Sequence, residues 1–145
     1  MSGGESSIGK WISVLYRCRM SYLGRTLEPY GISGGQSLFL LTLYFNNGES
    51  QEKISSCLKI DKTTTARAVK RLEDGGFVTR SVDISDKRAY KVFLTQKALG
   101  VVPHIHEALK RWEDLIKSEV TDDEYILLEK LLNKIADKAY GLGNP

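Results

Sequence analysis

The segment "DKTTTARAVKRL", residues 61–72, combines hydroxyl groups and cations at helical spacing. Three consecutive threonines are poor helix formers, because β-branched side chains lose rotamer freedom in a helix. The apolar residues around them nevertheless recur with a helical period. On a wheel of about 100° per residue, one face carries residues suited to a core: Thr65, Ala66, Val69 and Leu72. The other face carries short polar side chains and cations: Thr63, Thr64, Arg67, Ala68, Lys70 and Arg71.

The polar face of this segment suits the major groove of DNA. Short side chains at the start of a helix allow it to approach base edges, where a threonine can offer its hydroxyl to a base or phosphate and its methyl to thymine. The helix N-terminus also attracts phosphate. An alternative is that Thr63 and Thr64 only support Asp61 in capping the helix. We favour the DNA interpretation, since one cap needs only one such residue.

Positive charge is concentrated around this segment. Residues 50–95 contain ten Lys or Arg and six Asp or Glu, which gives +4, whereas the whole chain of 145 residues carries 21 and 18, which gives +3. The rest of the chain is therefore at −1. This asymmetry indicates a local anionic partner. The alternative is an ordinary solvated charged surface.

The surrounding pattern predicts the elements that hold this face. We expect helices over residues 8–27, 36–45 and 51–58, the last capped by Ser50, and a fourth helix that Asp61 caps and Gly75 and Gly76 end. Two helices joined by so short a turn form a helix-turn-helix. The period changes to two in residues 77–94, which predicts a hairpin with a charged tip. Two more helices follow, the first after Thr95 and the second after a Thr121–Glu124 capping box. Pro103 should kink or divide the first of them.

These residues resemble the MarR family of bacterial and archaeal transcriptional regulators. The strongest matches are "DKTTTARAVKRLEDGGFVTR" and the hairpin "DISDKRAYKVFLTQKA", and the similarity extends over nearly the whole chain. The resemblance implies a mainly α fold with a small β-wing. It implies a winged helix-turn-helix at residues 33–95, dimerisation helices at residues 1–32 and 96–145, and an obligate homodimer that binds palindromic double-stranded operator DNA.

The resemblance also assigns roles to the wing. The D-x-R motif of the family corresponds to Asp86 and Arg88, so Arg88 is expected in the minor groove and Asp86 is expected to steady it. Ser85 stands where the family often has proline. The DNA-binding residues expected from both arguments are Ser50, Lys62, Thr63, Thr64, Arg67, Ala68, Lys70, Arg71, Asp86, Lys87 and Arg88.

Members of this family often bind small phenolic acids such as salicylate and release DNA, so we expect a repressor with such an effector. Lys10 and Arg17 share a face of the first helix and could hold a carboxylate, while Tyr16, Tyr30 and Tyr44 could contact a ring. Two surface cations and structural tyrosines are an equally good interpretation.

Other functions receive less support. "GESSIGK" has phosphate-loop spacing, but Trp11 replaces the required hydroxyl and no strand precedes it. His104 and His106 point about 200° apart on a helix and cannot share a metal. Cys18 could make the protein a redox sensor, although it lies on an apolar stripe, and Cys57 is expected in the core.

A ligand-independent structural DNA-binding protein and an enzyme remain rival classes, although no catalytic constellation or cofactor motif is apparent. With no secretion signal and no apolar run long enough for a membrane span, we expect a cytoplasmic protein that does not bind membranes.

Overall fold

The computed structural model describes residues 7–82, 84–85 and 89–143. In this part of the chain the elements are α1 (Ile8–Leu27), the 3-10 turn η1 (Glu28–Tyr30), α2 (Gly34–Phe45), α3 (Gln51–Leu58), α4 (Lys62–Asp74), β1 (Val78–Val82), β2 (Tyr90–Leu94), α5 (Gln96–Lys117) and α6 (Asp122–Gly143). The predicted fold class is confirmed: the chain is mainly helical, with one small antiparallel hairpin. None of the described helices is both long enough and apolar enough to cross a membrane.

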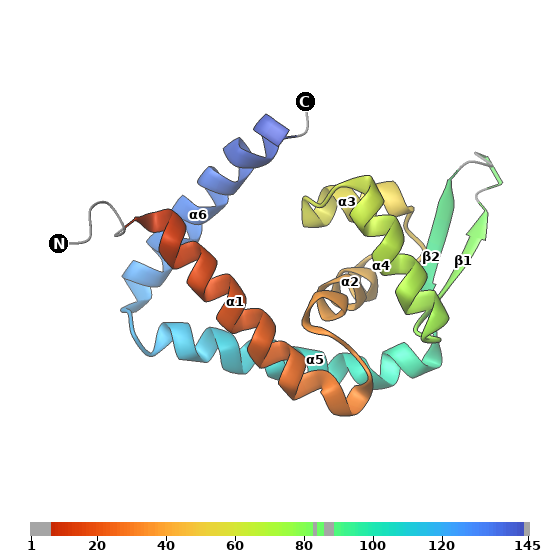
Figure 1. Cartoon of the computed structure of the whole chain (residues 1–145), viewed down its shortest axis with the longest axis horizontal. Helices are drawn as coiled ribbons and strands as arrows, with labels where there is room; N and C mark the ends of the chain where they lie inside the picture. The colour runs from red at the N-terminus through yellow and green to blue at the C-terminus, as the bar shows by residue number, and fades with distance from the viewer. Residues whose placement is uncertain (1–6, 83, 86–88, 144–145) are drawn as a thin grey trace.

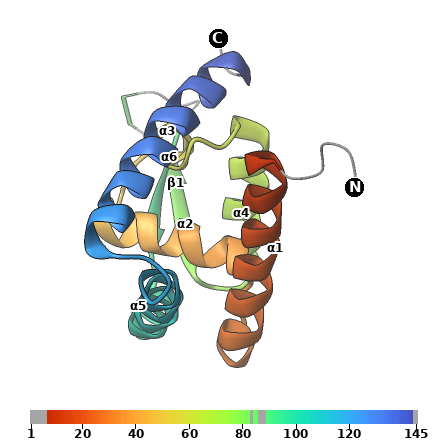
Figure 2. The same ribbon diagram turned by 90° about the vertical axis from the view of Figure 1, so that its left-hand side faces the viewer.

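The elements form a lobe and a set of long helices. Helices α2, α3 and α4 and the hairpin make the lobe, α5 runs beneath it, and α1 crosses over α5 (Figure 1). Figure 2 shows α5 nearly end on, with α6 rising above it and α1 standing to one side. The N-terminal half of α1 therefore projects away from the lobe, whereas the end of α6 returns to it, with Lys59 Nζ of α3 lying 3.0 Å from the Asp137 carboxylate of α6.

The hydrophobic core joins the lobe to the C-terminal half of α1 and to α5. Its fully buried members come from five helices and the hairpin: Leu23, Leu27, Leu40, Leu43, Ile54, Val69, Leu72, Val92 and Ile105. Helix α6 has no buried residue in the protomer. The core thus fixes the lobe on α5, whereas α6 and the start of α1 contribute nothing to it.

Side chains cap most helices where the sequence predicts. Asp61 caps α4 and Thr95 caps α5, and Thr121 and Glu124 exchange the two hydrogen bonds of a capping box. Helix α2 begins two residues earlier than predicted, because Ser33 forms a capping box with Gln36 across Gly34 and Gly35. The glycines had suggested a longer loop.

The prediction that Pro103 kinks or divides the helix is wrong as to division, because α5 runs as one helix through Pro103; a kink there stays a prediction. Proline lacks the N–H that would bond the preceding turn. Val101 and Val102 before it and Ile105 and Ala108 after it are all buried. Their packing holds both halves of α5 on one core, which outweighs the lost hydrogen bond.

The hairpin is hydrogen-bonded to the loop before α3. Strand β1 pairs with β2 in a register that places Arg80 opposite Val92. On the other edge of β2, the Gly48 amide donates to the Val92 carbonyl at 2.8 Å and the Val92 amide donates to the Glu49 carbonyl at 3.0 Å. Gly48 has a φ of 84°, and a Cβ there would lie 2.9 Å from the Phe93 ring, so this position requires glycine.

Candidate nucleic-acid interface

Helices α3 and α4 form a tight pair around a buried hydroxyl contact. Lys59 ends α3 in the left-handed region, with a φ of 54°, and the turn brings α4 back against α3. The Ser55 hydroxyl donates to Thr65 Oγ1 at 2.8 Å, and both side chains are buried. This contact fixes the angle between the two helices of the helix-turn-helix.

The three threonines of α4 have three different roles. Thr65 is fully buried, as its face of the wheel predicts, and its hydroxyl also donates to the Asp61 carbonyl at 3.0 Å. Thr64 donates its amide to Asp61 Oδ1 at 2.8 Å and its hydroxyl to Oδ2 at 2.7 Å. These two bonds from Thr64 lower the pKa of the Asp61 carboxyl below its usual value. Thr63 is exposed.

Thr64 therefore supports the Asp61 cap, as the capping alternative supposed, and its one hydroxyl proton is given to Asp61. The oxygen of Thr64 keeps a lone pair that could accept from a donor. Thr63 has no hydrogen bond from its hydroxyl to the described part of the chain, so its hydroxyl is available to a ligand. Of the three threonines, Thr64 supports the cap, Thr65 makes a buried contact, and Thr63 is a surface group.

The cations of α4 divide into paired and unpaired groups. Lys62 meets Glu52 at 3.2 Å, and Lys70 meets Asp74 at 3.0 Å, which raises the pKa of Lys70. Arg67 and Arg71 are exposed, with no ion pair to the described residues. Exposed ion pairs are weak, so all four cations are accessible to an anion. The two lysines would have to leave a carboxylate partner to bind it, whereas the two arginines have none to leave among the described residues.

Ala68 differs from its predicted place. It is half-buried and packs against the hydrophobic core, so it does not lie fully on the exposed face. Its small side chain sits at the boundary of the two faces, where a wheel of ideal geometry assigns residues poorly. The exposed face is formed mainly by Thr63, Arg67, Lys70 and Arg71.

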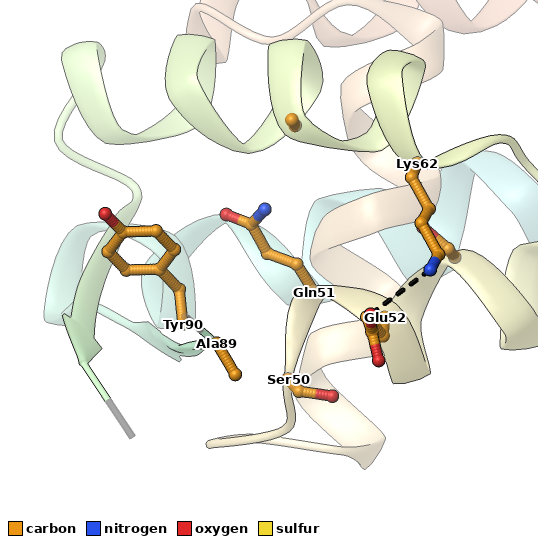
Figure 3. A pocket seen from close by; sticks show the side chains of 8 residues that line it. Ser50, Gln51, Glu52, Lys62, Ala89 and Tyr90 are labelled. Carbon is orange, nitrogen blue, oxygen red and sulfur yellow. Dashed lines mark hydrogen bonds and ion pairs between the residues drawn. The ribbon is translucent and has the colours of Figure 1, made fainter. Parts of the chain in front are cut away.

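A hollow of about 530 Å³ separates α3, α4 and the start of β2. Gln51 lies at its centre, between Tyr90 on one side and the Lys62–Glu52 pair on the other (Figure 3). Ser50, Ser55, Ala66 and Ala89 complete the lining. Ser50 also caps α3, because its hydroxyl accepts from the Lys53 amide at 3.1 Å, so this predicted DNA-binding residue has a structural role as well.

Arg80 makes several contacts in the structure, although in the sequence it contributed only to the positive charge of residues 50–95. It lies on β1 and forms a two-pronged ion pair with Glu73 of α4, with contacts of 3.0 and 3.3 Å. The pair lowers the pKa of Glu73 and raises that of Arg80. The alternation of a strand could have revealed it, since period two puts Arg80 on the same face as Val78 and Val82.

The predicted wing residues Asp86, Lys87 and Arg88 lie outside the described residues. Both strands that lead to this segment are described, and β1 and β2 project from the lobe beside α4 (Figure 1). The roles of the three tip residues stay predictions.

The residues expected to bind an effector do not come together within one protomer. Lys10 and Tyr30 lie at opposite ends of α1, a helix of about 30 Å, so one small molecule cannot touch both. Lys10 lies over the Trp11 ring and Tyr30 stacks on His104 at 4.1 Å. Tyr44 instead meets the edge of His106 at 5.9 Å, and Tyr16 and Arg17 are exposed on α1.

Both cysteines are exposed in the protomer. The prediction that Cys57 belongs to the core is therefore wrong. Ile54 and Ser55 supply the buried face of α3, and Cys57 falls outside it on so short a helix. The described residues contain no cluster of three or more side chains that could hold a metal ion.

Comparisons with known proteins agree on one family. A family model described as the MarR family matches residues 32–90. An uncharacterised HTH-type transcriptional regulator of Bacillus subtilis (strain 168), YybA, is 34% identical over 86% of this chain and 83% of its own.

Solved structures extend this similarity to three dimensions. A MarR transcriptional regulator from Methanosarcina mazei Go1 superimposes with a TM-score of 0.82 at 40% identity, covering 93% of this chain and 97% of the other. A MarR-family regulator from Listeria monocytogenes, crystallised with a 26-mer DNA, has a TM-score of 0.86 at 26% identity, covering 94% and 91%.

Proposed function

Because the chain belongs to the MarR family of DNA-binding transcriptional regulators, we propose that it acts as a homodimer on a palindromic operator. Helix α4 would enter the major groove and the β1–β2 wing the adjacent minor groove. The observation that carries this proposal is the exposed face of α4, on which Arg67 and Arg71 have no ion pair, and the Thr63 hydroxyl no hydrogen bond, to any of the described residues. The similarity to a relative crystallised with DNA supports it.

The proposed dimer would be built from α1, α5 and α6. Support comes from the apolar side chains that α1 and α6 expose in the protomer, among them Trp11, Leu15, Leu131 and Ile135. Soluble proteins rarely leave such large apolar patches uncovered. A two-fold dimer would carry its two α4 helices to half-sites about one helical turn apart. The segments 1–32 and 96–145 would then be the dimerisation parts and 33–95 the DNA-binding part.

We further propose that the protein is a repressor released by a small aromatic carboxylate or phenolic ligand. Lys10 and Arg17 lie seven residues apart on α1, a rise of about 10.5 Å, and both are exposed. The ligand must bind the DNA-incompetent form of the dimer more tightly than the competent form. Salicylate at millimolar concentration is then expected to weaken DNA binding, and an Arg17→Ala protein is expected to respond less. An unchanged response would remove Arg17 from the site.

Footprinting on the DNA upstream of the gene tests the central proposal. A dimeric regulator protects a short inverted repeat, whereas a structural DNA-binding protein protects DNA broadly and an enzyme of another class protects none. Protection of a single, asymmetric half-site would contradict the palindromic dimer. Redox sensing through Cys18 stays an alternative mode of control, and an oxidant that releases the footprint only when Cys18 is present would favour it over the small-molecule effector.

A further inference from the structure

Arg80 occupies a position in β1 where an apolar residue would be expected. Its neighbours on the same face of the strand are Val78 and Val82, and Val92 lies directly opposite on β2. Val78 and Val92 are buried. The Arg80 side chain is only 23% exposed. A charged group in this place must have partners that compensate for its lost hydration.

Among the described residues, the partners of Arg80 come from three other elements. Its Nε donates to Glu73 Oε2 at 3.3 Å and its Nη2 donates to Glu73 Oε1 at 3.0 Å, which ties β1 to α4. Its Nη1 donates to Gln51 Oε1 of α3 at 3.4 Å. The guanidinium also lies 4.9 Å from the centre of the Tyr90 ring of β2. One side chain therefore contacts both helices of the helix-turn-helix and both strands of the hairpin.

At the base of the hairpin, the start of α5 is hydrogen-bonded to the turn that follows α4. Thr95 Oγ1 donates to the Gly76 carbonyl at 2.7 Å, and Lys97 Nζ donates to the Gly75 carbonyl at 2.8 Å. Both carbonyls belong to the turn that follows α4. Arg80 lies four residues beyond Gly76, in the middle of β1, so its ion pair with Glu73 constrains the angle of the hairpin as well as the position of its base.

We propose that Arg80 is a positioning residue for DNA binding, which locks the wing against α4 and does not itself neutralise a phosphate. This proposal rests on the proposed function, in which α4 and the wing bind DNA together. Two recognition elements that must enter adjacent grooves lose affinity when their relative angle is not held, because the ordering cost is then met on binding. Arginine suits this role, since its planar fork pairs with a carboxylate in two places and stacks on a ring, which lysine cannot do.

Glu73 provides a test whose sign separates the two roles. Removing a negative charge from a helix that faces DNA ordinarily strengthens binding, because it reduces repulsion of the phosphates. If Arg80 instead positions the wing through Glu73, then Glu73→Gln weakens binding. Asp74 is the matched control, since it is the next residue on α4 and pairs with Lys70 at 3.0 Å, with no hydrogen bond to Arg80.

The experiment measures the affinity of the full-length protein for a duplex that the unaltered protein selects from a random pool, at several salt concentrations. Arg80→Gln and Glu73→Gln are each expected to weaken binding by about fivefold or more, an effect of the size of one modest contact. The slope of log affinity against log salt should stay unchanged. The double variant should be no weaker than Arg80→Gln alone, Arg80→Lys should recover only part of the loss, and Asp74→Asn should bind as tightly as the unaltered protein or more tightly.

Tighter or unchanged binding by Glu73→Gln would overturn the inference, as would a flatter salt slope for Arg80→Gln. Hydrogen exchange of the β1 and β2 amides in free Glu73→Gln gives a second readout, and it should be faster than in Asp74→Asn. Equal exchange in the two variants also counts against the positioning role. Arg67→Ala separates this inference from the proposed function: if Arg67→Ala weakens binding and Glu73→Gln does not, only the inference fails, whereas no effect of either contradicts the proposed function.

Discussion

Helices α4 and α6 are both amphipathic, but their exposed faces are opposite in character. Helix α4 buries Thr65, Val69 and Leu72 in its own protomer and exposes hydroxyls and cations. Helix α6 buries nothing in the protomer and exposes leucine and isoleucine side chains along its length. Within one protomer the apolar face of α4 is fully packed, whereas the apolar face of α6 is not.

This difference indicates two kinds of partner. A polar face is stable in water, so α4 can exist free and can bind an anion reversibly, with an affinity that depends on salt. An apolar face gains about 25 cal/mol for each Å² removed from water, so α6 favours permanent cover. In the proposed dimer, a second copy of the chain would offer that cover, because it would present the same face under two-fold symmetry.

The largest expected effect comes from a charge on the apolar face of α6. Leu131→Glu should raise the dissociation constant of the dimer by roughly a hundredfold or more, since a buried unpaired carboxylate is strongly unfavourable. Light scattering at micromolar concentration should give twice 16.3 kDa for the unaltered protein and a single chain mass for this variant. Lys130→Glu on the opposite side of α6 is the control and should remain a dimer. A stable monomer of the unaltered protein would contradict the proposal that a second copy of the chain covers the apolar face of α6.

The second effect concerns sequence reading by α4. Arg67→Ala should lose about 1–3 kcal/mol of discrimination between the operator and a scrambled duplex, if Arg67 contacts guanine with both prongs. Arg88→Ala should weaken binding to both duplexes and flatten the salt dependence, because a minor-groove arginine reads width and potential. Titrations of both variants against both duplexes decide this. If Arg67→Ala loses the same affinity for the operator as for the scrambled duplex, then α4 contacts only phosphates.

The third effect is on stability alone. Thr65→Val keeps the shape of the side chain but leaves the Ser55 hydroxyl without its acceptor inside the lobe. The expected loss is about 1–3 kcal/mol of unfolding free energy, measured by chemical denaturation. Ser55→Ala in addition should recover part of this loss. If the single variant is as stable as the unaltered protein, the hydroxyl pair does not hold α3 against α4.

The smallest effect is the pH dependence of the α4 cap. The two bonds from Thr64 lower the pKa of Asp61 in the folded state, so Asp61 stabilises the protein fully above its unfolded pKa near 3.8. This contribution is lost as the pH falls through the lower, folded value. The stability difference between the unaltered protein and Asp61→Asn should therefore shrink on going from pH 6 towards pH 3. A difference that stays constant would show that the charge of Asp61 does not contribute.

Much of the fold followed from local signals in the sequence. The Asp61 cap, the Thr121–Glu124 box and the end of α4 at Gly75 were all predicted, because each depends on residues three or four positions apart. The start of α2 was missed, since two glycines concealed the capping box of Ser33. The burial of Cys57 was predicted wrongly, because a helix of eight residues shows too little of its pattern to define a face.

The sequence by itself determined the family, the order of the elements and the polar face of α4, because these depend on periodicity, caps and motif spacing along the chain. Only the tertiary structure showed that Thr65 meets Ser55, that Arg80 joins α4, α3 and β2, and that the proposed effector residues are spread over α1, η1 and α2. Those contacts join residues that are distant along the chain, such as Arg80 and Gln51, 29 positions apart. No local pattern records such a distance; it is decided when the elements pack on one core and each buried polar group must find its partner.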